Sequence, residues 1–130
     1  MSRDPKLFLQ DILDSAAKVF SYTLGLTQEE FEANGMAYDA VIRNLEVIRE
    51  AANQIPQGLR DASHEVPWKM ICGFRDHLAH AYFGLDNDTV WEVVTAEIPT
   101  LAAEVGRLMK SLPQEPPPHE PPVQSSKSSE

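Results

Sequence analysis

The chain has 130 residues, 42% of them hydrophobic, which is enough for one domain with a real core. Its formal net charge of −9 argues against broad, sequence-independent wrapping of nucleic acid, because that mode of binding needs many Lys and Arg contacts to phosphates. A single cysteine, Cys72, excludes an internal disulfide. No apolar run approaches the roughly 18 residues that cross a bilayer, and Met1 to Pro5 lack a signal-peptide stretch, so we expect a cytoplasmic protein.

The first 112 residues predict helices joined by short turns, because no alternating segment is long enough for a sheet. We expect an all-α fold, an antiparallel bundle of four to five helices over residues 1–112. The first helix should run from about Pro5 to Leu24 and end at Gly25. Its apolar residues recur at helical spacing. They are Leu9, Ile12, Leu13, Ala16, Val19 and Phe20.

A second long helix follows a short helical turn around Phe31, which Thr27 and Glu30 should open as a capping box. Apolar residues of this second helix step by three and four positions from Tyr38 to Ile55. Its polar residues should lie on or beside the solvent-exposed face of the helix. They are Arg43, Asn44, Glu46, Arg49 and Glu50. Pro56 and Gly58 are expected to close the helix.

A third helix should begin at Pro67 and stop at Gly84. The cluster from Asp86 to Thr89 offers N-caps for a last helical region, in which Pro99 should kink or restart the helix. Residues 113–130 are rich in proline and serine and contain almost nothing to bury. We therefore expect a disordered C-terminal tail.

The third helix carries an unusual set of polar side chains. Four apolar residues share one arc of its helical wheel, which should face the core. They are Ile71, Phe74, Leu78 and Ala81. Arg75, Asp76, His80 and Tyr82 lie outside that arc, and histidine is the side chain best suited to move protons near neutral pH.

Such a set can cleave RNA without a metal ion. The ribose 2′-hydroxyl attacks the adjacent phosphorus when one group removes its proton and another protonates the leaving oxygen. His80 suits the proton transfer, and the guanidinium of Arg75 suits the anionic phosphorane. Asp76 lies four residues before His80, where it can orient the imidazole. Arg75 and His80 point about 140° apart on one helix, so a two-fold dimer is expected to complete the site.

The run from Arg75 to Tyr82 resembles the motif of HepT-like ribonucleases of the HEPN family. That motif is an Arg, four residues of which the first is Asn, Asp or His, then His, one residue and Tyr. The similarity extends over about Asp4 to Leu112. It includes Asp39 to Leu45 in the second helix, Val66 to Trp68 before the motif, and Phe83 to Asp86 and Val90 to Pro99 after it.

The resemblance implies a homodimeric, metal-independent RNA endonuclease that acts as the toxin of a type VII toxin–antitoxin system. Its partner would be a minimal nucleotidyltransferase antitoxin, its substrate RNA, including tRNA, and it would need no cofactor. The resemblance assigns Arg75 and His80 to catalysis, with Asp76 and His77 in support. Tyr82 would be the site where the antitoxin attaches AMP, which places bulk and negative charge where substrate phosphate binds.

Alternative interpretations remain open. The chain could be a non-catalytic helical subunit that binds a nucleotidyltransferase or a nucleotide, which its acidic charge favours. Asp76, His77 and His80, with His64, could instead hold a metal ion, although bundle sites usually use Glu-x-x-His pairs on facing helices.

Four other side chains have two readings each. Trp68 and Trp91 could stack bases, but packing is the commoner role of such residues. Arg43 and Arg49 could bind RNA or a partner's carboxylates, but exposed helix charges are the commoner explanation.

Overall fold

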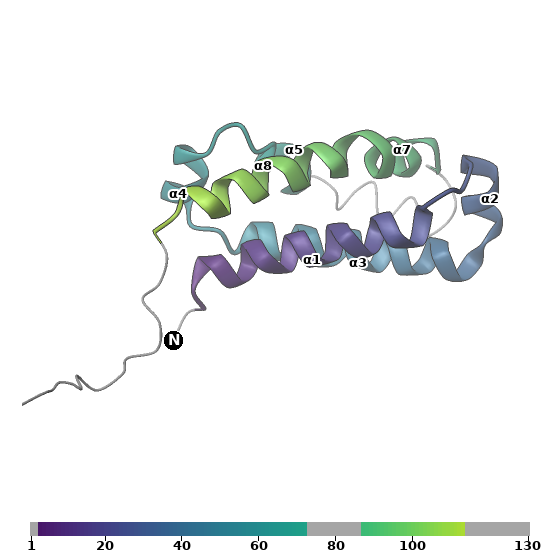
Figure 1. Cartoon of the computed structure of the whole chain (residues 1–130), viewed down its shortest axis with the longest axis horizontal. Coiled ribbons are helices and arrows are strands. Elements are labelled where there is room, and N and C mark those ends of the chain that lie inside the picture. The colour runs from purple at the N-terminus through teal and green to yellow at the C-terminus, as the bar shows by residue number, and fades with distance from the viewer. Residues whose placement is uncertain (1–2, 73–86, 114–130) are drawn as a thin grey trace, which may run out of the picture.

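A computed structural model describes residues 3–72 and 87–113. Three long helices form the body of the protein: α1 (Pro5–Thr23), α3 (Gly35–Asn53) and α8 (Ile98–Ser111). α1 and α3 lie side by side and run in opposite directions, and α8 crosses above them (Figure 1). The described residues contain no strand, so the predicted all-α bundle is confirmed.

The first helix matches its predicted bounds closely. Asp4 caps it, accepting a 2.9 Å hydrogen bond from the backbone amide of Lys6, and Pro5 occupies the first turn, where its missing N–H needs no partner. Gly25 follows the helix with φ +78°, a conformation that other residues adopt only with strain. Phe20, the last residue of the predicted apolar repeat, is 38% exposed. Val19, one helical step of about 100° away, faces the core instead.

The predicted capping box is confirmed in α2 (Gln28–Ala33). The side chain of Thr27 accepts from the amide of Glu30 at 3.1 Å, and the carboxylate of Glu30 accepts from the amide of Thr27 at 2.9 Å. Asn34 then ends α2 and begins α3, since its side chain accepts from the amide of Ala37. These local bonds set the sharp turn between the two helices.

Two expectations for the second long helix were wrong. Gly58 does not close it: α3 ends at Asn53, and Gly58 lies inside a further short helix, α4 (Gln57–Ala62), which follows Pro56. Asn44 does not lie on the solvent-exposed face: it is 9% exposed, because it faces α1. Its amide nitrogen donates a hydrogen bond to the carbonyl of Ala40 within its own helix.

The second half of the bundle is built from shorter pieces. α5 (Trp68–Cys72) begins immediately after Pro67, as expected. α7 (Asn87–Glu92) begins in the predicted cap cluster and continues through a π-helical turn, η1 (Val93–Glu97), into α8. Pro99 lies in the first turn of α8, so the prediction that the helix restarts there is confirmed.

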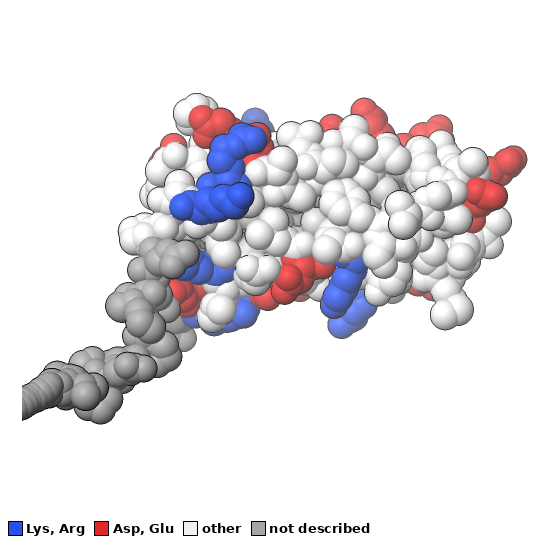
Figure 2. Space-filling model, viewed as in Figure 1, with Lys and Arg blue, Asp and Glu red and all other residues white. Residues whose placement is uncertain are grey.

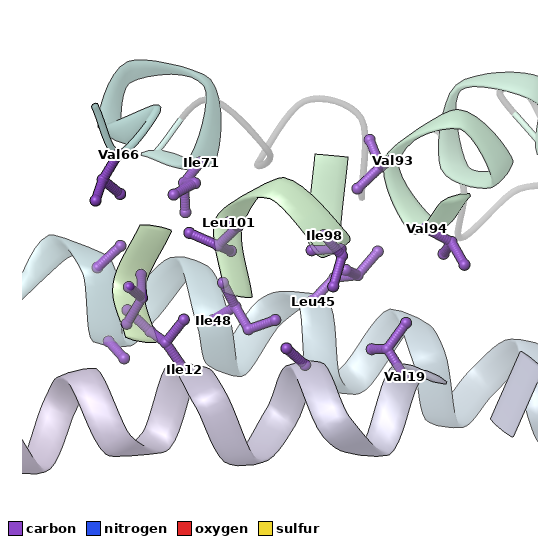
Figure 3. Close-up of a cluster of buried hydrophobic side chains, with 14 of the residues drawn as sticks. Ile12, Val19, Leu45, Ile48, Val66, Ile71, Val93, Val94, Ile98 and Leu101 are labelled. Carbon is purple, nitrogen blue, oxygen red and sulfur yellow. The ribbon is translucent and has the colours of Figure 1, made fainter. Parts of the chain in front are cut away.

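One hydrophobic core joins all these elements. Ile12 and Val19 from α1 meet Leu45 and Ile48 from α3, and Leu101 and Ile98 of α8 close over them (Figure 3). Ile71 of α5 and Val93 and Val94 of η1 extend the same cluster. None of the helices in the described ranges is long and apolar enough to cross a membrane. Cys72 is a half-buried free thiol, and the predicted tail beyond Pro113 lies outside the described residues.

Candidate functional site

The five residues of the predicted site lie outside the described residues. They are Arg75, Asp76, His77, His80 and Tyr82. The structure instead describes the two elements that flank them, α5 before the motif and α7 after it. The way in which these elements are held determines where the motif enters and leaves the described fold.

The element before the motif is anchored by α5. The indole nitrogen of Trp68 donates a 3.1 Å hydrogen bond to the carbonyl of Ser63, and the side chain of Trp68 is 8% exposed. Ile71 is fully buried, and α5 packs against α3. Trp68 is therefore a packing residue, as expected.

The element after the motif is anchored to the start of α3 and to α2. The hydroxyl of Tyr38 donates to Oδ1 of Asn87 at 2.7 Å, and the amide nitrogen of Gln28 donates to Oδ1 of Asp88 at 2.6 Å. The ring of Phe31 lies 5.2 Å from that of Tyr38 and 5.4 Å from that of Trp91, measured between centroids. Since the Trp91 ring packs on a buried aromatic residue, packing is its role in the described structure.

A hollow of about 350 Å³ begins beside the Tyr38–Asn87 contact and follows one face of α3. Tyr38, Asp39, Ile42, Arg43 and Glu46 line it. Both signs of charge and a phenol surround an apolar floor, so this face of α3 can receive a polar group of either sign. Sequence reasoning placed Tyr38 in the apolar stripe and missed its partner, because no local pattern links residues that are 49 positions apart.

On the face seen in Figure 2, the charged side chains form small separate groups. The middle of the face formed by α1 and α8 is largely free of charged side chains, while basic and acidic groups gather at its edges and ends (Figure 2). This distribution offers no broad basic surface on that face. A nucleic-acid contact there would have to be local.

The described part of the chain contains no group of three His, Cys, Asp or Glu side chains that could hold a metal ion. His64, the one described member of the metal alternative, is exposed and lies 3.5 Å from the carboxylate of Glu65. The other three members, Asp76, His77 and His80, lie in the undescribed segment.

Comparison with known proteins adds to this geometry. Residues 12–108 match the family model described as ribonuclease HepT-like. Two proteins of Methanocaldococcus jannaschii, each provisionally named an RNase, are 43% and 41% identical to the chain. Each alignment covers 85% of this chain, and they cover 95% and 91% of the relatives. A protein of Thermococcus cleftensis named "Probable ribonuclease HepT" is 36% identical over 85% of this chain and 100% of its own length. No solved structure matches the chain.

Proposed function

Because the chain belongs to the HepT-like ribonuclease family, we propose that it is an endoribonuclease that cuts RNA without a metal ion. The observation that carries this proposal is the motif from Arg75 to Tyr82, which lies inside the matched range of 12–108. The names of the relatives, each an RNase, support the same reaction class.

The proposed reaction is an internal transfer at one phosphodiester. The 2′-oxygen of the ribose forms a bond to the neighbouring phosphorus, and the bond from phosphorus to the 5′-oxygen of the next nucleotide breaks. The 2′-hydroxyl loses its proton and the leaving 5′-oxygen gains one, so the products are a 2′,3′-cyclic phosphate and a 5′-hydroxyl. His80 serves the proton transfers, and Arg75 stabilises the crowded anionic phosphorus.

The supporting roles follow from helical spacing. Asp76 stands four residues before His80 and would orient its imidazole, and His77 would assist from the edge of the same polar surface. Arg75 and His80 are five residues apart and would diverge on one regular helix. We therefore include a homodimer in the proposal, in which two copies of the motif form one cleft.

We further propose that the protein is the toxin of a two-component system acting in the cytoplasm. A minimal nucleotidyltransferase would be the antitoxin, and the transfer of AMP to Tyr82 would inhibit cleavage. The added group brings negative charge and bulk close to Arg75, so it competes with substrate phosphate. Residues 113–130 would form a flexible tail outside the catalytic domain of residues 1–112.

The net charge of −9 favours a second candidate, a non-catalytic subunit that binds a nucleotidyltransferase or a nucleotide. Both candidates predict a complex with the nucleotidyltransferase. Only the first predicts RNA cleavage by the isolated chain.

Incubation of the full chain, freed of partner and AMP, with a tRNA pool in EDTA separates the two candidates. Cleavage to cyclic-phosphate ends that is lost in both His80→Ala and Arg75→Ala is the expected result. Intact RNA with the unmodified wild-type chain would favour the non-catalytic subunit. Cleavage that persists in both variants would show that His80 and Arg75 are not the catalytic residues.

A further inference from the structure

A second hollow, of about 450 Å³, lies between α1 and α3. Ser15, Lys18 and Tyr22 line it from α1, and Arg43 and Asn44 line it from α3. We call this feature the α1–α3 groove. Its lining combines two cations, the carboxylates of Asp11 and Asp14, a tyrosine that is 39% exposed, and two polar side chains that are mostly buried.

Both cations of the groove are without a charged partner in the described structure. Lys18 follows Asp14 by four residues and Arg43 follows Asp39 by four, a spacing that permits helical ion pairs. Neither pair forms within residues 3–72 and 87–113. The two cations therefore remain available to a ligand.

The two carboxylates that line the groove, in contrast, have partners. Asp11 holds the guanidinium of Arg3 at 2.8 Å, and Asp14 accepts a 2.9 Å hydrogen bond from the side chain of Gln10. Arg3 offsets the charge of Asp11, whereas the neutral amide of Gln10 leaves Asp14 charged, so the lining, within the described residues, sets two unpaired cations against one uncompensated carboxylate.

The floor of the groove has unused hydrogen-bonding capacity. Ser15 is 5% exposed and Asn44 is 9% exposed. Asn44 uses its amide nitrogen on the carbonyl of Ala40, while its side-chain oxygen and the hydroxyl of Ser15 have no hydrogen-bond partner in the described ranges. Neither oxygen is one of the fully buried, unpaired side-chain atoms of the described residues, so solvent reaches both in the groove and a polar ligand can replace that water.

Arg43 connects the groove to α7, the element that follows the motif in the sequence. It lines both the α1–α3 groove and the hollow that begins at Tyr38. Tyr38 in turn is bonded to Asn87, the first described residue after the motif. Along α3, Tyr38 and Arg43 are five residues apart, about 7.5 Å of helix.

We propose that the α1–α3 groove binds a single-stranded segment of the RNA substrate. The inference rests on the proposed ribonuclease function. Lys18 and Arg43 contact two phosphates, Tyr22 stacks against a base, and Ser15 with Asn44 hydrogen-bonds a sugar or base edge. Two local phosphate contacts reconcile RNA binding with an acidic protein that offers no broad basic surface in Figure 2.

The test measures binding rather than cleavage. The full chain carrying His80→Ala is titrated into a fluorescent single-stranded RNA of about ten nucleotides, a length in the range that single-strand binding sites cover. Adding Lys18→Ala with Arg43→Ala should weaken binding about tenfold or more. The slope of log Kd against log salt should fall by about 1.4, since each lost single-strand phosphate contact contributes about 0.7.

The matched control removes two cations from α8, Arg107→Ala with Lys110→Ala. Both residues are exposed and neither lines the groove, so this variant should bind nearly as tightly as its parent. If both double variants lose RNA affinity equally, the loss reflects net charge alone, and the proposal that the groove binds RNA is overturned. Unchanged binding in the Lys18 and Arg43 variant, or no binding by the parent, would also overturn it.

Two further experiments ask which ligand the groove binds and whether the proposed ribonuclease function holds. Displacement of the RNA by poly-glutamate at lower concentration than by unlabelled RNA would assign the groove to an acidic peptide and overturn the proposal. Cleavage of tRNA by the wild-type chain, measured separately, tests the function alone. If the chain cleaves tRNA but binds RNA independently of Lys18 and Arg43, the groove proposal is wrong and the ribonuclease proposal stands. If binding depends on Lys18 and Arg43 but no cleavage occurs, the groove proposal is supported and the ribonuclease proposal is wrong.

Discussion

The hydroxyl of Tyr38 donates a 2.7 Å hydrogen bond to Oδ1 of Asn87 and so joins α3 to the first described residue after the motif. This contact spans 49 positions of sequence and lies at one end of the hollow along α3. It is a tertiary restraint on the first turn of α7, where the described chain resumes after the motif.

Tyr38→Phe should lower the free energy of unfolding by about 1 kcal/mol, because the part-buried hydrogen bond to Asn87 is lost. RNA cleavage should fall several times further than the loss of folded protein explains, because the end of the motif is held less firmly. Urea denaturation and single-turnover cleavage measure the two effects. Tyr22→Phe, which removes an exposed phenol without a hydrogen bond in the described structure, should leave stability unchanged. Unaltered stability and cleavage in Tyr38→Phe would contradict this role.

Two glycines should respond to alanine with opposite signs. Gly25 has φ +78°, so Gly25→Ala should cost about 1 kcal/mol of stability. Gly106 lies inside α8 with nothing within 4 Å of an added Cβ, so Gly106→Ala should gain roughly 0.5–1 kcal/mol. Thermal unfolding followed by circular dichroism compares them. A midpoint that does not fall in Gly25→Ala would show that the turn after α1 is not held in this conformation, and a lower midpoint in Gly106→Ala would contradict the gain expected inside α8.

Leu101→Ala should destabilise the fold by about 2–5 kcal/mol, since the side chain is fully buried where α8 meets α1 and α3. Leu24 is 84% exposed, so Leu24→Ala should stay within about 0.5 kcal/mol of wild type. Urea denaturation of both variants provides the comparison. A small effect at Leu101 would mean that α8 does not close the core in solution.

Co-expression with a minimal nucleotidyltransferase should increase the intact mass of the chain by one or more AMP units and abolish RNA cleavage. The gain should vanish in Tyr82→Phe and persist in Tyr22→Phe, because only Tyr82 belongs to the motif. Intact-mass spectrometry reads the result directly. A mass gain that survives Tyr82→Phe would move the modification to another residue.

The amino-acid sequence by itself determined the long helices and several of their ends, because these depend on neighbours within a few residues. The periodic apolar residues of α1 and α3, the reciprocal bonds of Thr27 and Glu30, and the restart at Pro99 are all local effects. The family was also recognisable from the run between Arg75 and Tyr82 and its surroundings. The roles of those motif residues remain a proposal.

Only the tertiary structure decided which helix face meets which neighbour. Asn44 is buried and Phe20 is exposed because α1 and α3 pack through Val19 and its neighbours. The helical period alone does not decide which of two adjacent residues faces the neighbouring helix. The bond from Tyr38 to Asn87 and the α1–α3 groove likewise join residues far apart in the chain. Such contacts depend on the simultaneous packing of several helices, which no local pattern encodes.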